Sequence, residues 1–156
     1  MLDINIPGCK KLKIEKIVFD LNGTIACDGK LIEGVKEGIN RLAEEFEIYV
    51  LTADTFGTAA ELLEEINAEL VVIDECDGSK FKADFVENIG RKRVIAVGNG
   101  NNDAQMLKNA ELGIAVIGPE GTARGALLGA ELISRDINDV FAIISNPGRL
   151  KASLRK

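Results

Sequence analysis

The sequence predicts a three-layer, Rossmann-like α/β fold in which helices cover both faces of a mostly parallel sheet. From residue 14 onward, short apolar runs alternate with amphipathic stretches, a pattern typical of repeated strand–helix units. The chain has 156 residues, of which 46% are hydrophobic and 28% charged, and this suits one ordinary globular domain. We therefore expect a single domain over residues 1–156, without a linker, an internal repeat or a low-complexity tract.

The individual elements follow from the spacing of apolar residues. Strands are expected at the short apolar runs 14–20, 48–52, 70–73, 94–97, 114–117 and 131–134. Helices are expected at the amphipathic stretches 34–46, 58–67, 80–89, 104–109, 122–128 and 136–144. Phe81, Phe85 and Ile89 should form the buried face of their helix, and Asp136 should cap the last helix. Ahead of these elements, residues 2–7 and 11–14 should pair as an edge hairpin around Gly8.

The composition excludes several classes of function. The chain contains no histidine, which rules out Ser-His and Cys-His nucleophile pairs and histidine-ligated zinc or iron sites. Its 19 basic and 25 acidic residues give a net charge of −6, so no nucleic-acid partner is expected. The basic tail over 149–156 is expected to be a solvated, frayed terminus.

Cysteine usage and hydropathy indicate a cytoplasmic protein. Cys9, Cys27 and Cys76 lie far apart and form no C-x-x-C pair, which favours a reducing compartment over a disulfide framework or a metal knuckle. No apolar run approaches the roughly 20 residues that a membrane-spanning helix needs. We therefore expect no association with a membrane.

Polar residues that can carry chemistry gather where the expected strands end. In an open α/β sheet, ligands bind outside the carboxyl ends of the strands. Three segments occupy such ends, DLNGT at 20–24, TAD at 52–54 and GNGNND at 98–103, and Lys82 lies on the helix before the fourth strand. Backbone amides and lysine bind phosphate oxygens, whereas carboxylates bind divalent cations. The sequence therefore predicts a site for a phosphoryl group beside a metal ion.

Four segments occur in the order of the motifs of the haloacid dehalogenase (HAD) superfamily: VFDLNGT at 18–24, VLTADT at 50–55, KADFV at 82–86 and VGNGNNDAQMLKNAELGIAV at 97–116. The chain resembles this superfamily over about residues 14–135. It looks most like the soluble P-type-ATPase-like phosphatases, because the last segment is similar to the G-D-G-x-N-D turn of P-type ATPases. The resemblance implies a HAD core fold and a Mg²⁺-dependent phosphatase or phosphotransferase.

The resemblance also implies a role for each matching residue. Asp20 would attack phosphorus and become an aspartyl phosphate, while Thr52 and Lys82 would hold the transferring oxygens. Asn102 would orient Lys82 or Asp103. The implied catalytic residues are Asp20, Asn22, Thr52 and Lys82. The implied phosphate-binding residues are Leu21, Asn22, Thr52, Ala53, Lys82 and Asn102. The implied Mg²⁺ ligands are Asp20, Asn22 through its carbonyl, Asn99 and Asp103.

Two asparagines replace acids that the superfamily has at central positions. Asn22 stands where HAD phosphatases carry the general acid and base, and an amide cannot transfer a proton in that way. Hydrolysis of the phosphoenzyme should therefore be slow. Asn99 stands at a metal-ligating aspartate, and the missing charge should weaken metal binding. Both asparagines precede glycine, so one hypothesis is that deamidation restores aspartate and activity; the simpler interpretation is that glycine serves the turn.

The spacing of the motifs leaves no room for a cap domain. Thr24 and Thr52 are 52 − 24 = 28 positions apart, and Thr52 and Lys82 are 82 − 52 = 30 apart, enough for about one helix and one strand each. A capless site suits a bulky or macromolecular phosphorylated substrate, or a neighbouring subunit that covers it, so a homo-oligomer is a further hypothesis. The alternative function is a catalytically impaired domain that binds phosphate, a nucleotide or a partner as a regulatory module.

Three smaller features have structural interpretations. Asp54 has two interpretations, an acid that approaches the site or, as the favoured one, the cap of the helix that opens near Phe56. The segment GPEG at 118–121 is expected to be a plain turn. Asp28 followed by Gly29 is typical of a hairpin turn. The superfamily has a small flap over the active site at this position, with Cys27 expected to be an inert thiol.

Overall fold

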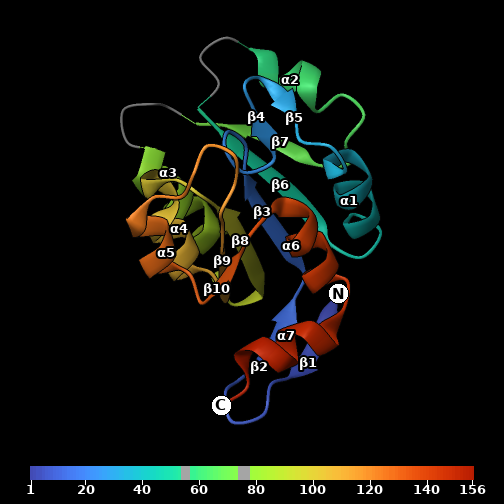
Figure 1. Ribbon diagram of the computed structural model, residues 1–156, viewed down its shortest axis with the longest axis vertical. Helices are drawn as coiled ribbons and strands as arrows, with labels where there is room; N and C mark the ends of the chain where they lie inside the picture. The colour runs from blue at the N-terminus through green and yellow to red at the C-terminus, as the bar shows by residue number, and fades with distance from the viewer. Residues whose placement is uncertain (54–56, 74–77) are drawn as a thin grey trace.

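The computed structural model describes residues 1–53, 57–73 and 78–156, and a parallel sheet with helices on both faces lies at its centre (Figure 1). The strands of this sheet are β3 (Lys16–Asp20), β6 (Glu47–Thr52), β7 (Glu69–Val72), β8 (Val94–Gly98), β9 (Leu112–Val116) and β10 (Leu132–Ser134). They run in the order β10-β9-β8-β3-β6-β7, and all neighbours are parallel. This architecture confirms the predicted three-layer α/β fold.

The helices form a layer on each face of the sheet (Figure 1). One layer contains α1 (Val35–Leu42), α2 (Thr58–Leu62) and α6 (Ile137–Ile144). The other contains α3 (Gly78–Asn88), α4 (Ala104–Asn109) and α5 (Arg124–Gly129). Because side chains alternate along a strand, Ile17 and Phe19 of β3 pack under the first layer and Val18 under the second.

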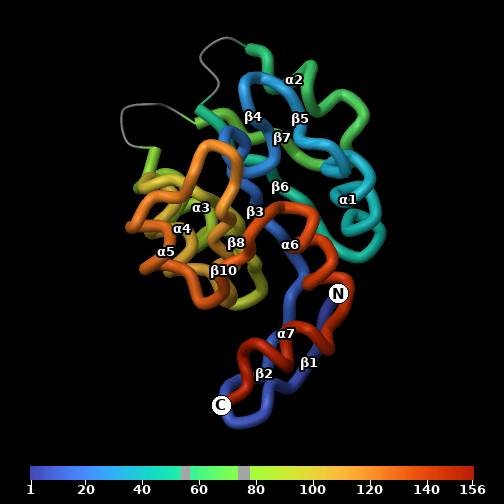
Figure 2. Tube along the Cα trace, in the orientation of Figure 1, coloured from blue at the N-terminus to red at the C-terminus, as the bar shows by residue number. Residues whose placement is uncertain are grey.

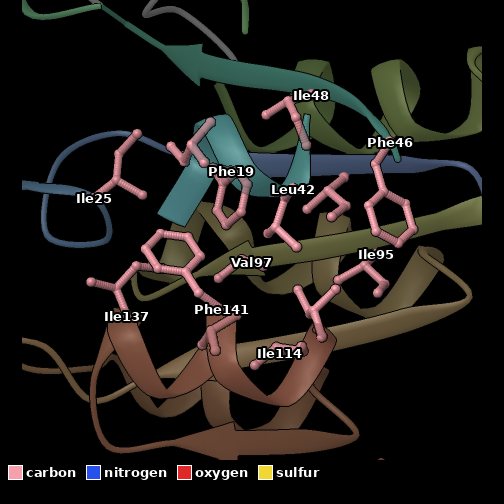
Figure 3. Packing of buried hydrophobic residues seen from close by; sticks show 14 of the residues in the cluster. Phe19, Ile25, Leu42, Phe46, Ile48, Ile95, Val97, Ile114, Ile137 and Phe141 are labelled. Atoms are coloured by element: carbon pink, nitrogen blue, oxygen red, sulfur yellow. The ribbon is translucent and has the colours of Figure 1, made fainter. Parts of the chain in front are cut away.

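The core under α1 and α6 fixes the position of β3 (Figure 3). Phe19 meets Phe141 of α6 edge to face, with the ring centroids 6.0 Å apart. Gly38 of α1 faces the same ring so closely that a Cβ there would lie 2.2 Å from Cδ2 of Phe141. A glycine is therefore needed for α1 to approach α6, and this packing holds the strand that ends at Asp20.

The register of the sheet brings three strand ends together. Asp20 pairs with Leu51 of β6, and Phe19 pairs with Val97 of β8. Thr52 and Gly98 each follow these partners directly, so both lie at the same edge of the sheet as Asp20. Asp20, Thr52 and the turn after Gly98 therefore lie at the carboxyl ends of neighbouring strands.

The helix α3 differs from its predicted packing. Lys82, Ala83 and Val86 are its buried residues, whereas Phe81 is 41% exposed. Phe85 is half-buried and packs its ring against Tyr49, with the centroids 5.3 Å apart. The prediction that Phe81 belongs to the core is wrong, because consecutive helical residues point about 100° apart and Lys82 takes the inward position.

The first and last segments of the chain pack together at the end of the molecule far from the strand ends (Figure 2). β1 (Leu2–Asn5) and β2 (Lys11–Ile14) form the expected antiparallel hairpin, but as a separate two-stranded sheet rather than an edge of the central one. The predicted strand 14–20 is accordingly interrupted at Glu15. The helix α7 (Pro147–Leu154) lies beside this hairpin.

The prediction of a frayed basic tail is therefore wrong. Residues 147–154 are helical, Asn146 caps the helix by accepting from the amide of Gly148, and Leu150 is fully buried. The amide of Lys156 donates to the carbonyl of Pro7 at 3.2 Å. Among the described residues, no helix is both long and apolar enough to cross a membrane.

Candidate active site

Asp20 ends β3 and is followed by a tight turn. The amides of residues 24, 25 and 26 all donate to the carbonyl of Leu21, and the amide of Gly23 donates to that of Ala26. Gly23 has a φ of 81°, and a Cβ there would lie 2.4 Å from Nδ2 of Asn99. Glycine is required here both for the backbone conformation and for the close approach of the neighbouring loop.

Beyond this turn, β4 (Ala26–Cys27) and β5 (Lys30–Leu31) pair as a small antiparallel hairpin. Asp28 and Gly29 form its turn with φ values of 51° and 73°, as the sequence predicts. Cys27 is partly exposed, and burial together with the carboxylates of Asp28 and Glu120 raises the pKa of its thiol. A raised thiol pKa is consistent with the expected inert cysteine.

One buried lysine joins the two acids of the site. Lys82 Nζ lies 2.5 Å from Oδ1 of Asp20 and 2.7 Å from Oδ1 of Asp103. Lys82 is 1% exposed and Asp103 fully buried. The side chains of three elements, the end of β3, the helix α3 and the turn after β8, therefore converge on a single ammonium group.

The turn after β8 is shaped around Asp103. Its Oδ2 accepts hydrogen bonds from the amides of Asn99 and Gly100, at 3.0 and 2.8 Å. A Cβ on Gly98 would lie 2.6 Å from Cγ of Asp103, so the carboxylate rests directly on the backbone. The short 3₁₀ turn Asn101–Asp103 then leads into α4. These contacts fix the orientation of the carboxylate that holds Lys82.

The charges of this cluster do not cancel. Burial and, after it, the negative charge of Asp103 raise the pKa of the Asp20 carboxyl to about 6, against the opposing effects of Lys82 and Thr24. Burial disfavours the Lys82 ammonium, but Asp20 and Asp103 outweigh it and raise the pKa of Lys82, which stays charged. One ammonium thus faces two carboxylates, which leaves an excess of one negative charge when both acids are ionised.

That donor set fits a divalent cation. Asp20 and Asp103 are oxygen donors that carry the uncompensated charge, and the amide oxygen of Asn99 lies beside them, bonded through Thr24 to Asp20. Hard cations such as Mg²⁺ prefer carboxylate and amide oxygens. The predicted metal ligands are therefore chemically suited to Mg²⁺, although the assignment of each ligand remains a prediction.

Thr52 contributes a buried hydroxyl to the site. The residue is 2% exposed, and its Oγ1 has no hydrogen-bond partner within the part of the chain that the structure describes. A buried hydroxyl without a partner is costly, so it points to a ligand that supplies one. Thr52 ends β6 beside Asp20, which is where the sequence places a phosphate-binding threonine.

The remaining predicted residues lie around this cluster. Leu21 is buried, Ala53 is half-buried, and Asn22 and Asn102 are exposed. The amide oxygen of Asn102 lies over Gly100, where a Cβ would be 2.4 Å away. Lys82 donates to Asp20 and Asp103, and Asp103 also accepts from two backbone amides, so the role of Asn102 in orienting them stays a prediction. Asp54, Phe56 and Cys76 lie outside the described residues.

Thr24 belongs to the site although the sequence analysis did not assign it a role. Its fully buried Oγ1 lies 3.0 Å from Oδ2 of Asp20 and 3.2 Å from Oδ1 of Asn99. The available signal was its position four residues after Asp20 in the DLNGT turn. The segment 118–121 forms the predicted turn, but its Gly121 carbonyl also accepts from Nδ2 of Asn99, at 3.0 Å.

Comparison with known proteins places this geometry in a family. The model of the haloacid dehalogenase-like hydrolases matches residues 85–118. The uncharacterized protein MJ0073 of Methanocaldococcus jannaschii is 50% identical over 64 residues, which are 41% of this chain and 69% of that protein. A probable copper-exporting P-type ATPase of Archaeoglobus fulgidus is 32% identical over 128 residues, 80% of this chain but only 15% of the ATPase.

The fold gives an independent comparison. The cobalt-bound deoxy-D-mannose-octulosonate 8-phosphate phosphatase of Haemophilus influenzae superimposes with a TM-score of 0.70 at 10% identity, covering 85% of this chain and 87% of that one. Such low identity speaks for the fold alone. Together with the family match and the relation to P-type ATPases, it identifies the chain as a member of the haloacid dehalogenase superfamily.

Proposed function

We propose that this protein is a Mg²⁺-dependent phosphohydrolase or phosphotransferase that acts through an aspartyl phosphate on Asp20. The observation that carries the proposal is the buried hydroxyl of Thr52, which has no hydrogen-bond partner among the described residues and lies at the strand end next to Asp20 and Lys82. A phosphoryl group placed there would accept from Thr52 and from Lys82 while facing the Asp20 carboxylate. Membership of a hydrolase family and the phosphatase fold neighbour support an enzyme of this type.

In the proposed reaction Asp20 is the nucleophile. One of its ionised oxygens forms a bond to phosphorus, and the bond from phosphorus to the leaving oxygen breaks with its electron pair. Thr52 and Lys82 hold the transferring oxygens, and Asp103 keeps Lys82 in place through the 2.7 Å contact. Fixed donors of this kind stabilise charge that redistributes in the transition state without having to reorganise.

The metal would be held by Asp20, Asp103, Asn99 and the carbonyl of Asn22. When bound, Mg²⁺ neutralises charge on the phosphoryl oxygens. The cobalt ion in the Haemophilus influenzae phosphatase supports the use of a divalent cation in this fold. Because Asn99 offers a neutral amide where an acid would bring a negative charge, we expect weaker binding than with an acidic ligand at this position.

Asn22 is proposed to limit the second half of the reaction. Its exposed side chain stands two residues after Asp20, where an acid would protonate the leaving group and then activate water. An amide does neither, and positioned acid–base catalysis typically contributes about 10²–10⁴-fold. The aspartyl phosphate should therefore persist, which favours transfer to an acceptor over rapid hydrolysis.

The substrate is proposed to be a phosphate ester or anhydride. The segment between Thr24 and Thr52 forms β4, β5, α1 and β6, which is the small hairpin and one strand–helix unit that the spacing predicts. A bulky or macromolecular substrate, a homo-oligomer that covers the site, and a cytoplasmic location all remain predictions from the sequence.

The test is incubation with acetyl phosphate and Mg²⁺ followed by intact-mass measurement. We expect an increase of about 80 Da, the mass of one phosphoryl group, that is lost in Asp20→Asn. Asp84→Asn is the matched control, because it makes the same change at an exposed acid on α3. An adduct that survives Asp20→Asn would contradict the assignment of the nucleophile.

The exposed amide of Asn22 also favours a second candidate, a regulatory module that binds phosphate or a phosphorylated partner without turnover. The same experiment separates the two functions. If no adduct forms and no phosphate is released while phosphate still binds, the module is the better description.

A further inference from the structure

Asn99 is bonded to two other segments of the chain. Its Nδ2 donates to the carbonyl of Gly121 at 3.0 Å, and its Oδ1 lies 3.2 Å from Oγ1 of Thr24. Its own carbonyl accepts from the amide of Ala123 at 2.9 Å. The residue is 8% exposed; its bond to Thr24 is buried, and its bond to Gly121 is partly buried. Asn99 therefore ties the turn after Asp20 to the loop over 118–123.

Only an amide side chain at position 99 satisfies both the carbonyl of Gly121 and the hydroxyl of Thr24. The carbonyl of Gly121 is an acceptor and requires a donor, which fixes nitrogen on that side and turns oxygen toward Thr24. An aspartate would offer two acceptors at neutral pH, so one of them would face the Gly121 carbonyl without a proton between them. The contacts explain why this chain has asparagine where its superfamily has an acid.

The amide oxygen of Asn99 and a carboxylate oxygen of Asp20 compete for the single hydroxyl proton of Thr24. The Thr24 hydroxyl has one hydrogen, and its two acceptors are Oδ2 of Asp20 at 3.0 Å and Oδ1 of Asn99 at 3.2 Å. While Asp20 is ionised, the charged oxygen is the stronger acceptor. Once an Asp20 oxygen is bonded to phosphorus, the carboxyl has lost its charge and with it this advantage.

We propose that Asn99 is a positioning residue that controls the Thr24 hydroxyl: its amide, oriented by Gly121, supplies the second acceptor that this buried hydroxyl uses when Asp20 is phosphorylated. The inference rests on the proposed aspartyl-phosphate chemistry. Thr24 thus keeps a hydrogen bond in both states of Asp20. An aspartate at position 99 would instead hold the proton in both states and withdraw it from the nucleophile.

The test compares rates of adduct formation from acetyl phosphate and Mg²⁺ in a double-mutant cycle. Asn99→Asp should speed phosphorylation of Asp20 by about tenfold, because the ionised nucleophile loses a charge-assisted hydrogen bond that stabilises it more before the reaction than after it. In a Thr24→Val background, which lacks the hydroxyl, the same substitution should change the rate less than about threefold. Thr24→Ser keeps the hydroxyl and should restore the dependence on residue 99.

A control variant distinguishes an effect on the Thr24 proton from a general loosening of the loop. Thr122 Oγ1 donates to the carbonyl of Val116 at 2.6 Å, so Thr122→Val loosens the same loop without touching Thr24 or Asn99. Both Thr122→Val and Asn99→Asp should speed hydrogen exchange over 118–123, but only Asn99→Asp should speed formation of the adduct. An equal increase of the rate in Thr122→Val would overturn the inference in favour of a loop effect.

Other outcomes are equally decisive. If Asn99→Asp only tightens Mg²⁺ binding, and its effect on rate is the same with and without the Thr24 hydroxyl, Asn99 acts solely as the proposed metal ligand and the inference fails. Equal rates in Asn99→Asp and wild type would also overturn it while leaving the proposed function standing. Absence of any adduct in the wild-type protein would instead remove the proposed function on which the inference rests.

Discussion

Lys82 reaches Asp20 across 62 positions of sequence, with Nζ 2.5 Å from Oδ1, and the bond is buried. The second contact of Lys82, to Asp103, completes a chain of two acids and one base with little access to water. Buried ion pairs are expensive to form, and removal of one partner leaves an uncompensated charge. This cluster therefore both organises the site and makes the fold depend on it.

Replacement of Lys82 should consequently destabilise the protein. Lys82→Met leaves two buried carboxylates facing each other, and the free energy of unfolding should fall by about 3–5 kcal/mol. Urea denaturation measures the change, with Lys80→Met as the control because Lys80 is exposed on the same helix. Equal unfolding curves for the two variants would contradict the buried network.

A second prediction concerns the missing acid. Asn22→Asp restores a group that can donate and accept a proton beside Asp20, and its exposed position lets the new carboxylate ionise without a desolvation cost. Decay of the Asp20 adduct should accelerate by about 10²–10⁴-fold, measured by intact mass after acetyl phosphate is removed. Asn88→Asp adds the same charge at the end of α3 and should leave the decay unchanged. Unchanged decay in Asn22→Asp would refute the role assigned to position 22.

The sequence predicted the location of the site because parallel strands end at one edge of a sheet. Asp20, Thr52 and the turn after β8 are adjacent there for that reason alone. The inward position of Lys82 was harder to predict, because an amphipathic reading of α3 favours Phe81. Burial of a lysine becomes favourable only when two carboxylates from distant segments contact it. The spacing of hydrophobic residues along the sequence gives no information about such partners.

The contacts of Asn99 could not be predicted from the pattern at all. They depend on the close approach of three loops, which is possible because Gly23 and Gly118 have no side chain: a Cβ on Gly118 would lie 2.7 Å from the carbonyl oxygen of Gly23.

The C-terminal helix, by contrast, has a hydrophobic pattern that is visible in the sequence. Leu150 and Leu154 are four residues apart and both pack on the core, but the surrounding basic residues favoured a frayed tail.

A third prediction concerns the two Asn-Gly pairs. Deamidation requires the following backbone nitrogen to attack the asparagine side chain, and both nitrogens are engaged as donors. The amide of Gly23 donates to the Ala26 carbonyl at 2.7 Å, and that of Gly100 to Asp103 at 2.8 Å. Peptide mapping should show slower deamidation at Asn22 and Asn99 in the folded protein than in urea. Equal rates in the two conditions would revive deamidation as a route to activity.

A fourth prediction tests the packing of α3 on β6 through the single tyrosine of the chain. Burial first, and then the Glu47 carboxylate that accepts the 3.0 Å bond from its hydroxyl, raise the pKa of Tyr49 to about 12. Because the unfolded phenol ionises near pH 10, the folded state holds its proton more tightly between these values. The contribution of Tyr49 to the free energy of unfolding is thus fully present below about pH 10 and is lost as the pH rises toward 12.

The absorbance of the phenolate reports this titration directly, since the chain has one tyrosine and no tryptophan. Glu47→Gln should lower the transition, because it removes the neighbouring negative charge. Tyr49→Phe should remove the contribution of this group to the decline in stability between pH 10 and 12. A wild-type transition near pH 10 would mean that the Tyr49 ring of β6 does not pack against Phe85 as described.

The fifth prediction separates stability from activity at Thr52. Valine has the shape of threonine without the hydroxyl, and that hydroxyl is buried without a partner within the described part of the chain. Thr52→Val should therefore leave the free energy of unfolding unchanged or raise it by about 1 kcal/mol, because an unsatisfied polar group is removed. Phosphorylation of Asp20 should nevertheless fall about tenfold or more, because a donor to the phosphoryl oxygens is lost. Thr122→Val is the matched control: it breaks an existing hydrogen bond and should lower stability instead. A loss of stability in Thr52→Val without a loss of phosphorylation would mean that the hydroxyl serves the fold and not a phosphoryl group.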